Sequence, residues 1–194
     1  MKNRLIVAVV AVVAVVAAGL ALPAAAQEIY VSDPPHTIAH FETGHLGISW
    51  QRGWFNKVDA RVTLDRAAKK GSIEVVIDTA SLNTGHEARD KYLRSPDYLD
   101  VEKFPTITFK SNNLKFNGDN LAGADGELTI LGVTKAVSLT VSLFRCIAHP
   151  TNKRDMCGAD ASTAIKRSEF GLKRGAVGIG DDVKISIQIE AYKQ

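Results

Sequence analysis

The sequence contains little cysteine, few aromatic residues and no marked excess of charge of either sign. There are two cysteines among 194 residues, aromatic residues make up 7% of the chain, and the formal net charge is +3. Proteins that bind nucleic acids usually carry a clustered basic surface, so this near balance argues against a nucleic-acid partner. Valine, isoleucine, leucine and phenylalanine are frequent enough beyond the N-terminus to form a core, which argues against a disordered chain.

Long hydrophobic runs are missing after the N-terminal region, and this excludes a protein with several membrane spans. The single run covers residues 5–22, which are all uncharged Ala, Val, Leu, Ile or Gly. It follows the basic residues Lys2 and Arg4 and ends at Pro23. The small residues at 24–26 then match the cleavage pattern of a secretory signal peptide.

We therefore predict a signal peptide at residues 1–26, cleaved after Ala26, and one mature domain at residues 27–194. The compartment is then a bacterial periplasm, and the mature chain has no stable membrane span. The alternative is an uncleaved anchor, because residues 5–22 are just long enough to cross a bilayer.

The two cysteines fit an oxidising compartment. Cys146 and Cys157 lie close together in the sequence, and such a pair typically forms a disulfide there. A disulfide that closes a loop of this size stabilises the fold by about 2–3 kcal/mol. A metal site formed with His149 and Asp155 is the alternative, although the spacing matches no standard zinc pattern.

The mature sequence alternates between apolar and polar residues in the manner of antiparallel β-strands. Period-two alternation indicates a strand with one buried and one solvated face. Turn residues separate the segments, for example at residues 117–120 and 178–182. The predicted strands cover residues 73–78, 106–110, 137–144 and 183–190, with weaker strands at 37–43, 54–64, 121–130 and 157–166.

One segment, residues 79–104, lacks strand alternation. Within it, residues 86–94 read as a helix with Thr84 as the N-cap. The whole plan is therefore an all-β fold of eight antiparallel strands with a short helical insertion. Closure into a barrel leaves no open sheet edge, and an eight-stranded barrel has room for one slender ligand.

The predicted inward faces of these strands are almost wholly apolar. Ala159, Ala161 and Thr163 are small inward-facing side chains, and a ring of small residues would leave a tube for a lipid or isoprenoid tail. A filled core is the alternative, and these residues alone do not decide between the two. The inward-facing residues are Ala60, Val62, Leu64, Ile73, Val75, Ile77, Ile107, Phe109, Leu128, Ile130, Val137, Leu139, Val141, Ile185 and Ile187.

No catalytic motif is recognisable. There is no nucleophile elbow, no His-Glu-x-x-His pair and no Ser/His/Asp order of a known hydrolase. His36, His40 and His45 have no diagnostic spacing for a metal. We therefore predict neither an enzyme nor a metal centre, with enzymatic activity as the lesser alternative.

A series of short motifs occurs in order over nearly the whole mature sequence. The motifs are His36, Phe41, His45-Leu46-Gly47, Gly53-x-Phe55, Asp78-Thr79-Ala80-Ser81-Leu82-Asn83-Thr84, His86 to Ser95, Tyr98-Leu99-Asp100, Lys103-Phe104-Pro105, Thr108-Phe109, Gly126-x-Leu128-Thr129-Ile130, Gly132-Val133-Thr134-Lys135 and Ile165-Lys166-Arg167-Ser168-Glu169-Phe170-Gly171. With these motifs, of which the block from Asp78 to Asp100 is the most specific, the mature chain resembles the YceI-like family of periplasmic, lipocalin-like barrels linked to polyisoprenoid binding. Ala136 departs from the family, which usually has proline there, and the cysteine pair is not general in it.

The resemblance implies an extended barrel around a long apolar tunnel. It implies a carrier that binds an isoprenoid, such as a polyprenyl phosphate or a quinone, or a fatty-acid-like amphiphile, with no other cofactor. A homodimer is compatible with it. The alternative is a filled barrel that acts through its surface as a stress-response or partner-binding protein. The ligand-binding residues expected from the motifs and inward faces are Phe41, His45, Trp50, Phe55, Leu82, Leu93, Leu99, Phe104, Ile107, Phe109, Ile130, Leu139, Ile165, Arg167 and Phe170.

The polar residues among these candidates each have two interpretations. His45 either hydrogen-bonds a ligand head or is satisfied by nearby backbone. The charged residues of the 86–94 helix form either a solvated face of mutual ion pairs, such as Asp90 with Arg94, or place Arg89 or Arg94 at the tunnel mouth. Arg167 has inward parity on its strand, and we expect Glu169 or a ligand head as its partner.

Overall fold

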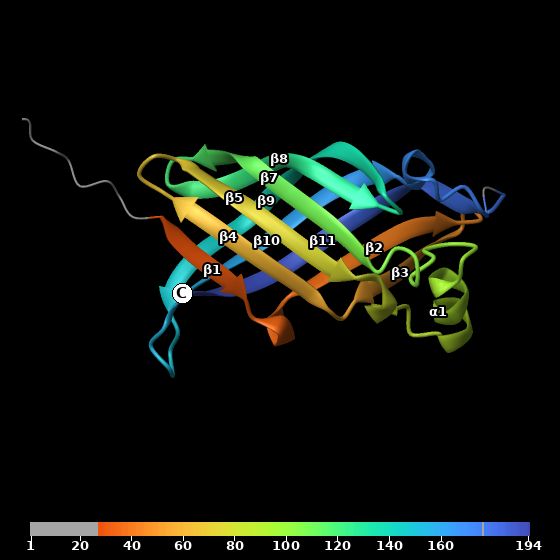
Figure 1. The fold of residues 1–194 in the computed structure, drawn as a ribbon, viewed down its shortest axis with the longest axis horizontal. Coiled ribbons are helices and arrows are strands. Elements are labelled where there is room, and N and C mark those ends of the chain that lie inside the picture. The colour runs from red at the N-terminus through yellow and green to blue at the C-terminus, as the bar shows by residue number, and fades with distance from the viewer. Residues whose placement is uncertain (1–26, 176) are drawn as a thin grey trace, which may run out of the picture.

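The computed structural model of the protein describes residues 27–175 and 177–194, so the predicted signal peptide lies outside the described residues. The described chain folds into antiparallel strands with one α-helix and three short 3-10 turns (Figure 1). The strands are β1 (Glu28–Ser32), β2 (Ile38–His45), β3 (Ser49–Phe55), β4 (Val58–Asp65), β5 (Lys70–Asp78), β6 (Leu82–Asn83), β7 (Thr106–Asn117), β8 (Asn120–Ile130), β9 (Val133–Ala148), β10 (Asp155–Lys166) and β11 (Ile179–Lys193), and the helix is α1 (Glu87–Arg94).

Eight of these strands close into a barrel, as the sequence predicts. The order is β1-β4-β5-β7-β8-β9-β10-β11, and pairing of β1 with β11 completes the ring. Strand β11 is long enough to pair with two neighbours on the same side. Its C-terminal part lies opposite β1, with Lys193 facing Tyr30, and its middle lies opposite β2, with Ile187 facing Ala39. Strands β2, β3 and β6 therefore extend the wall at one end of the barrel.

The strand pattern differs from the prediction in two places. The segment 54–64, predicted as one strand, is the end of β3 and the start of β4 around a turn at Asn56 and Lys57. Phe55 and Val58 are both buried, and this spacing of three breaks the two-residue period. The other difference is that β1, β6 and residues 49–53 of β3 were not predicted. The apolar residues of β1 are consecutive rather than alternating, and β6 has only two residues.

A β-bulge in β9 reverses part of the predicted alternation. Asp160 of β10 faces Leu143, while the next residue, Ala161, faces Val141, so one residue of β9 is left over. Beyond this point Phe144 packs inside the barrel and Leu143 is 51% exposed. Alternation over the predicted strand 137–144 would place Leu143 on the same inward face as Val137, Leu139 and Val141, and for Leu143 this prediction is wrong.

The helical insertion is present, but its cap is not the predicted one. Helix α1 begins at Glu87, and His86 is the N-cap, with its Nδ1 accepting a hydrogen bond from the Arg89 amide. Thr84 instead donates its amide and its hydroxyl to the buried Asp90. This contact ties the chain leaving β6 to the helix.

The two cysteines form the predicted disulfide. Cys146 and Cys157 are direct partners in the β9–β10 register, and their sulfur atoms are bonded. Over residues 27–175 and 177–194 there is no cluster of three or more His, Cys, Asp or Glu side chains suited to a metal ion. None of the helices formed by these residues is long and apolar enough to cross a membrane.

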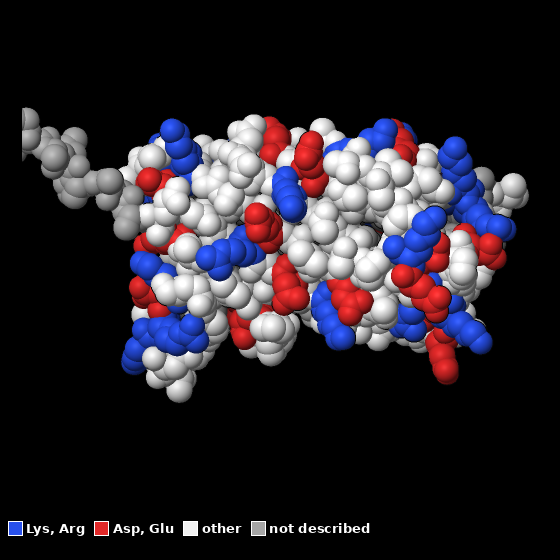
Figure 2. Space-filling model, viewed as in Figure 1, with Lys and Arg blue, Asp and Glu red and all other residues white. Residues whose placement is uncertain are grey.

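The barrel interior divides into a packed end and a hollow end. Tyr30, Leu64, Cys157 and Ala191 form a buried cluster at the end where β1 and β4 lie. Toward α1, apolar side chains line a cavity and remain partly accessible from within. The outer surface shows no single-sign patch on the face seen in Figure 2, where acidic and basic side chains are interspersed.

Candidate functional site

The cavity in the hollow end of the barrel has a volume of about 450 Å³. This is within the usual size of a small-molecule site, and its lining is overwhelmingly apolar, as such sites require. The walls come from β2, β3, β5 and β7–β11, and the segment from β6 through Leu99 covers one side. A cavity rather than a filled core therefore occupies this part of the barrel.

The structure brings most of the sequence-predicted site residues to this cavity. Trp50 does not line it and is 46% exposed. Phe104 and Phe170 do not line it either, and Phe170 is packed in the core with 1% exposure. The predicted residues that line the cavity are Phe41, His45, Phe55, Leu82, Leu93, Leu99, Ile107, Phe109, Ile130, Leu139, Ile165 and Arg167.

Many of the remaining cavity-lining residues were predicted from alternation to face the barrel interior, but they were not predicted to contact a ligand. Val75, Ile77, Leu128, Ile185 and Ile187 were predicted to face inward and do line the cavity. Thr163 lines it as well, in keeping with its predicted parity. Gln51, Thr84, Tyr98, Leu172 and Ile179 also reach the cavity. They lie at strand ends and in loops, where no periodic pattern marks an inward side chain.

A polar cluster at the α1 side of the cavity centres on Arg89. Its Nη1 donates to Oε1 of Gln51 at 2.6 Å, its Nε donates to Oγ1 of Thr84 at 2.8 Å, and its Nη2 donates to the Thr84 carbonyl at 2.9 Å. All three of these partner atoms are uncharged. The guanidinium therefore lies at the cavity edge, bound to Gln51 and Thr84, and it has no ion pair with a carboxylate of residues 27–175 or 177–194. Oγ1 of Thr84 in turn donates to Asp90.

The other charges of α1 do not form the predicted ion pairs. Asp90 is buried and accepts hydrogen bonds from Thr84 rather than pairing with Arg94. Arg94 donates from Nη2 to the carbonyl of Leu82. These two side chains fasten the helix to β6 and to Thr84, the residue that follows it. The contacts replace the solvent-exposed ion pair of Asp90 with Arg94 that the i,i+4 spacing suggested.

Arg167 is another cation on the cavity wall, and Glu169, one of its two expected partners, does not pair with it. It is 4% exposed, and neither Glu169 nor any other carboxylate pairs with it in the described chain. Its guanidinium donates to four backbone carbonyls: those of Gly180 at 2.9 Å, Arg174 at 2.8 Å, Ile179 at 3.2 Å and Leu172. These bonds hold the loop between the 3-10 turn at Arg167–Phe170 and β11 against the barrel.

Tyr98 lines the cavity near Arg167. Burial raises the pKa of the Tyr98 phenol, and the positive charge of Arg167 opposes that rise. The site therefore combines an apolar interior with two guanidinium groups, those of Arg89 and Arg167, that no carboxylate contacts in the part of the chain that the structure describes. Such an arrangement excludes water from a chain-like guest and offers a cation to an anionic group at its edge.

Comparison with known proteins agrees with this architecture. The model of the YceI-like domain matches residues 30–191. A UPF0312 protein of Pseudomonas aeruginosa is 36% identical over 160 residues, which are 82% of this chain and 83% of that protein.

Two solved structures have the same fold. BcnA of Burkholderia cenocepacia has a TM-score of 0.69 at 26% identity, covering 82% of this chain and 98% of that one. A domain from Saccharophagus degradans described as polyisoprenoid-binding has a TM-score of 0.61 at 18% identity, covering 86% and 98%. With the family model matching nearly all of the barrel, the chain belongs to the YceI-like family.

Proposed function

We propose that the protein is a binding or carrier protein for an isoprenoid or a similar long-chain amphiphile, and that it has no enzymatic activity. The observation that carries this proposal is the apolar cavity of about 450 Å³ inside a closed barrel. Each buried CH₂ of a tail contributes roughly 0.8 kcal/mol, so a long chain binds tightly without polar contacts. The hollow interior also favours a carrier over a filled barrel that acts only through its surface.

The ligand enters with its tail toward the packed cluster around Leu64 and its head toward α1. Arg89 lies at the cavity edge with its charge directed to neutral partners, so a phosphate or carboxylate head adds a charge-assisted hydrogen bond there. The similarity to the Saccharophagus domain supports a polyisoprenoid tail. Polyprenyl phosphates, quinones and fatty acids all share the required tail.

The protein acts in the periplasm after removal of residues 1–26, leaving the barrel domain at residues 27–194. The targeting pattern of the sequence supports this location, and the disulfide between Cys146 and Cys157 is consistent with an oxidising compartment.

Native mass spectrometry of the purified mature protein, followed by organic extraction, tests the proposal. We expect a co-purified or added prenyl or acyl compound to appear as a defined mass increase. An empty barrel that also fails to bind added polyprenyl phosphate, quinone and fatty acid would overturn it.

Introduction of a charge into the cavity tests its position. Ile107 is buried on the cavity wall of β7, whereas Val76 is exposed on the outer face of the adjacent β5. We expect Ile107→Glu to abolish binding of a fluorescent fatty acid and Val76→Glu to leave it unchanged, because only the first places a carboxylate in the tail site. Near-ultraviolet circular dichroism checks that both variants are folded. Equal affinity in the two variants would refute this placement.

A further inference from the structure

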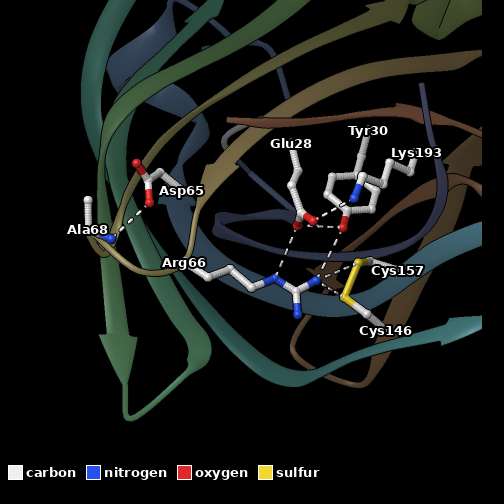
Figure 3. A network of polar contacts seen from close by, with 8 residues as sticks. All are labelled: Glu28, Tyr30, Asp65, Arg66, Ala68, Cys146, Cys157 and Lys193. Atoms are coloured by element: carbon white, nitrogen blue, oxygen red, sulfur yellow. Dashed lines mark hydrogen bonds and ion pairs between the residues drawn. A yellow bond between two sulfur atoms is a disulfide. The ribbon is translucent and has the colours of Figure 1, made fainter. Parts of the chain in front are cut away.

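The disulfide at the packed end of the barrel is in contact with an arginine (Figure 3). Nη2 of Arg66 lies 2.7 Å from Sγ of Cys146 and 3.3 Å from Sγ of Cys157. Arg66 follows β4 in the sequence, whereas the cysteines lie on β9 and β10. The closed barrel thus brings a cationic donor to both sulfur atoms from a distant part of the chain.

The guanidinium is held in this position by several groups. Its Nη2 also donates to the Tyr30 hydroxyl at 3.2 Å, and its Nε lies 3.6 Å from Oε2 of Glu28. Cζ of Arg66 lies 5.7 Å from the Phe144 ring centroid. Lys193 donates to the other oxygen of Glu28 at 2.6 Å, so the carboxylate is shared between two cations. Three side chains, those of Tyr30, Glu28 and Phe144, therefore hold Arg66 in place, and Lys193 fixes Glu28.

A guanidinium in this place changes the chemistry of the sulfurs. A positive hydrogen-bond donor beside a cysteine stabilises its thiolate over its thiol. A lower pKa of the cysteine thiol makes its sulfur a better leaving group. It also makes the reduced pair more stable, so the disulfide becomes easier to reduce. Glu28 opposes this effect, but Lys193 neutralises that carboxylate in turn. The remaining ionisable groups facing the site are Tyr30, Asp65 and Asp155.

A surface pocket reaches one of the two cysteines. A pocket of about 730 Å³ adjoins the disulfide and is lined by Arg66, Cys146, Lys193 and Glu28, among others. Cys157 is buried at 6% exposure, whereas Cys146 is only partly buried. An incoming thiol therefore reaches Cys146 first.

We propose that Cys146 and Cys157 form a thiol–disulfide exchange site for small thiols, with Arg66 as its positioning residue. The thiolate of a first small thiol attacks Sγ of Cys146, the S–S bond breaks, and its electron pair stays on Cys157 as a thiolate beside Arg66. A second thiolate then attacks the first thiol's sulfur in the mixed disulfide and releases Cys146 as a thiolate. Two thiols are oxidised to a disulfide, and the cysteine pair is reduced.

Replacement of Arg66 tests the electrostatic part of this proposal in the folded, oxidised protein. With reduced glutathione as the probe, we expect Arg66→Gln to slow reduction by about three- to tenfold for each unit by which the leaving thiol's pKa rises. A higher glutathione concentration should then be needed for half-reduction. Arg66→Lys should keep most of the wild-type behaviour, because it retains the charge. Arg154→Gln is the matched control, since Arg154 stacks on Tyr192 at the same end of the barrel.

A second measurement remains informative if Arg66→Gln is poorly folded. In the Cys146→Ser variant, the pH dependence of thiolate absorbance gives the pKa of Cys157, the leaving thiol of the first step. We expect that pKa below the usual thiol value, and rising when Arg66→Lys or Arg66→Gln is added, more for the latter. A normal Cys157 pKa, or glutathione reduction at the same rate in wild type and Arg66→Gln, would overturn the proposal. Fatty-acid binding in the cavity should be unchanged by Arg66→Gln, so this test is independent of the carrier function.

Discussion

At the scale of single residues, the three arginines on the cavity wall behave differently. Arg52 is paired with Glu42, whereas Arg89 and Arg167 have no carboxylate partner among the described residues. Arg167 uses its donors only on backbone carbonyls, two of them at the start of β11, so its role is to hold the chain entering that strand. Arg89 donates once to the Thr84 carbonyl, but its other two hydrogen bonds go to the side chains of Gln51 and Thr84, which can rearrange around a ligand more easily than backbone. Of the two, Arg89 is therefore the better candidate for an anionic head.

Replacement of Arg89 should separate the head of the ligand from its tail. We expect Arg89→Gln to weaken binding of a long-chain fatty acid by about tenfold or more, since a charge-assisted hydrogen bond contributes about 1.5–3 kcal/mol. Binding of the corresponding long-chain alcohol should change little. Lys91→Gln, an exposed position on the same helix, is the control. Equal losses for acid and alcohol would show that Arg89 supports the fold of this region rather than the head. Isothermal titration calorimetry measures both affinities.

At the scale of elements, closure of the barrel depends on a short seam between β1 and β11. Only Tyr30, Val31 and Ser32 are paired there with β11. The pair of Glu28 and Lys193 adds a contact at 2.6 Å at the end of this seam. The hydrogen bond from Lys193 lowers the pKa of the Glu28 carboxyl, with smaller effects from Tyr30 and Arg66 and partial opposition from burial.

Because the pKa of Glu28 is lowered in the folded protein, the free energy of unfolding depends on pH in a defined direction. A carboxyl whose folded pKa lies below its unfolded value stabilises the fold above that unfolded value, and the contribution disappears as the pH falls through the folded pKa. We expect Glu28→Gln to lower the free energy of unfolding by about 0.5 kcal/mol at neutral pH, as for a partly exposed pair. The difference from wild type should vanish below the folded pKa of Glu28. Urea unfolding at several pH values measures it, with Glu127→Gln on the exposed face of β8 as control. A difference that persists in acid would assign the effect to packing instead.

At the scale of the whole molecule, the fold has a packed end and a hollow end, and these have different tasks. The cluster around Tyr30, Leu64 and Ala191 stabilises the barrel, while the cavity toward α1 leaves apolar surface uncovered inside it. Stability and binding are therefore separable along the barrel axis. A side chain that fills the hollow end should improve packing and remove the binding site.

The substitution Thr163→Phe tests this separation. Thr163 faces the cavity from β10, and the neighbouring Ser162 is exposed on the outer face. We expect Thr163→Phe to reduce fatty-acid affinity at least about tenfold while the melting temperature stays the same or rises, because cavity filling typically adds about 0.5–2 kcal/mol. Ser162→Phe should leave affinity unchanged. A large fall in the melting temperature of Thr163→Phe alone would mean that the hollow end cannot accept added volume.

The sequence by itself determined the local features that depend on neighbours along the chain. Alternation at 73–78 and 183–190 predicts strands and their inward faces, and the charged, non-alternating segment 86–94 predicts a helix. The cysteine spacing predicts a disulfide. These signals are local because the side-chain period of a strand or helix is a property of a few consecutive residues.

Tertiary structure alone decided how those faces meet. The bulge between Val141 and Leu143 reverses a face of β9, and no local pattern shows which residue of a run is left unpaired. Filling one end of the barrel and leaving the other hollow depends on the summed volumes of side chains from many strands. The contact of Arg66 with the disulfide joins β4 to β9 and β10, which only closure of the ring brings together.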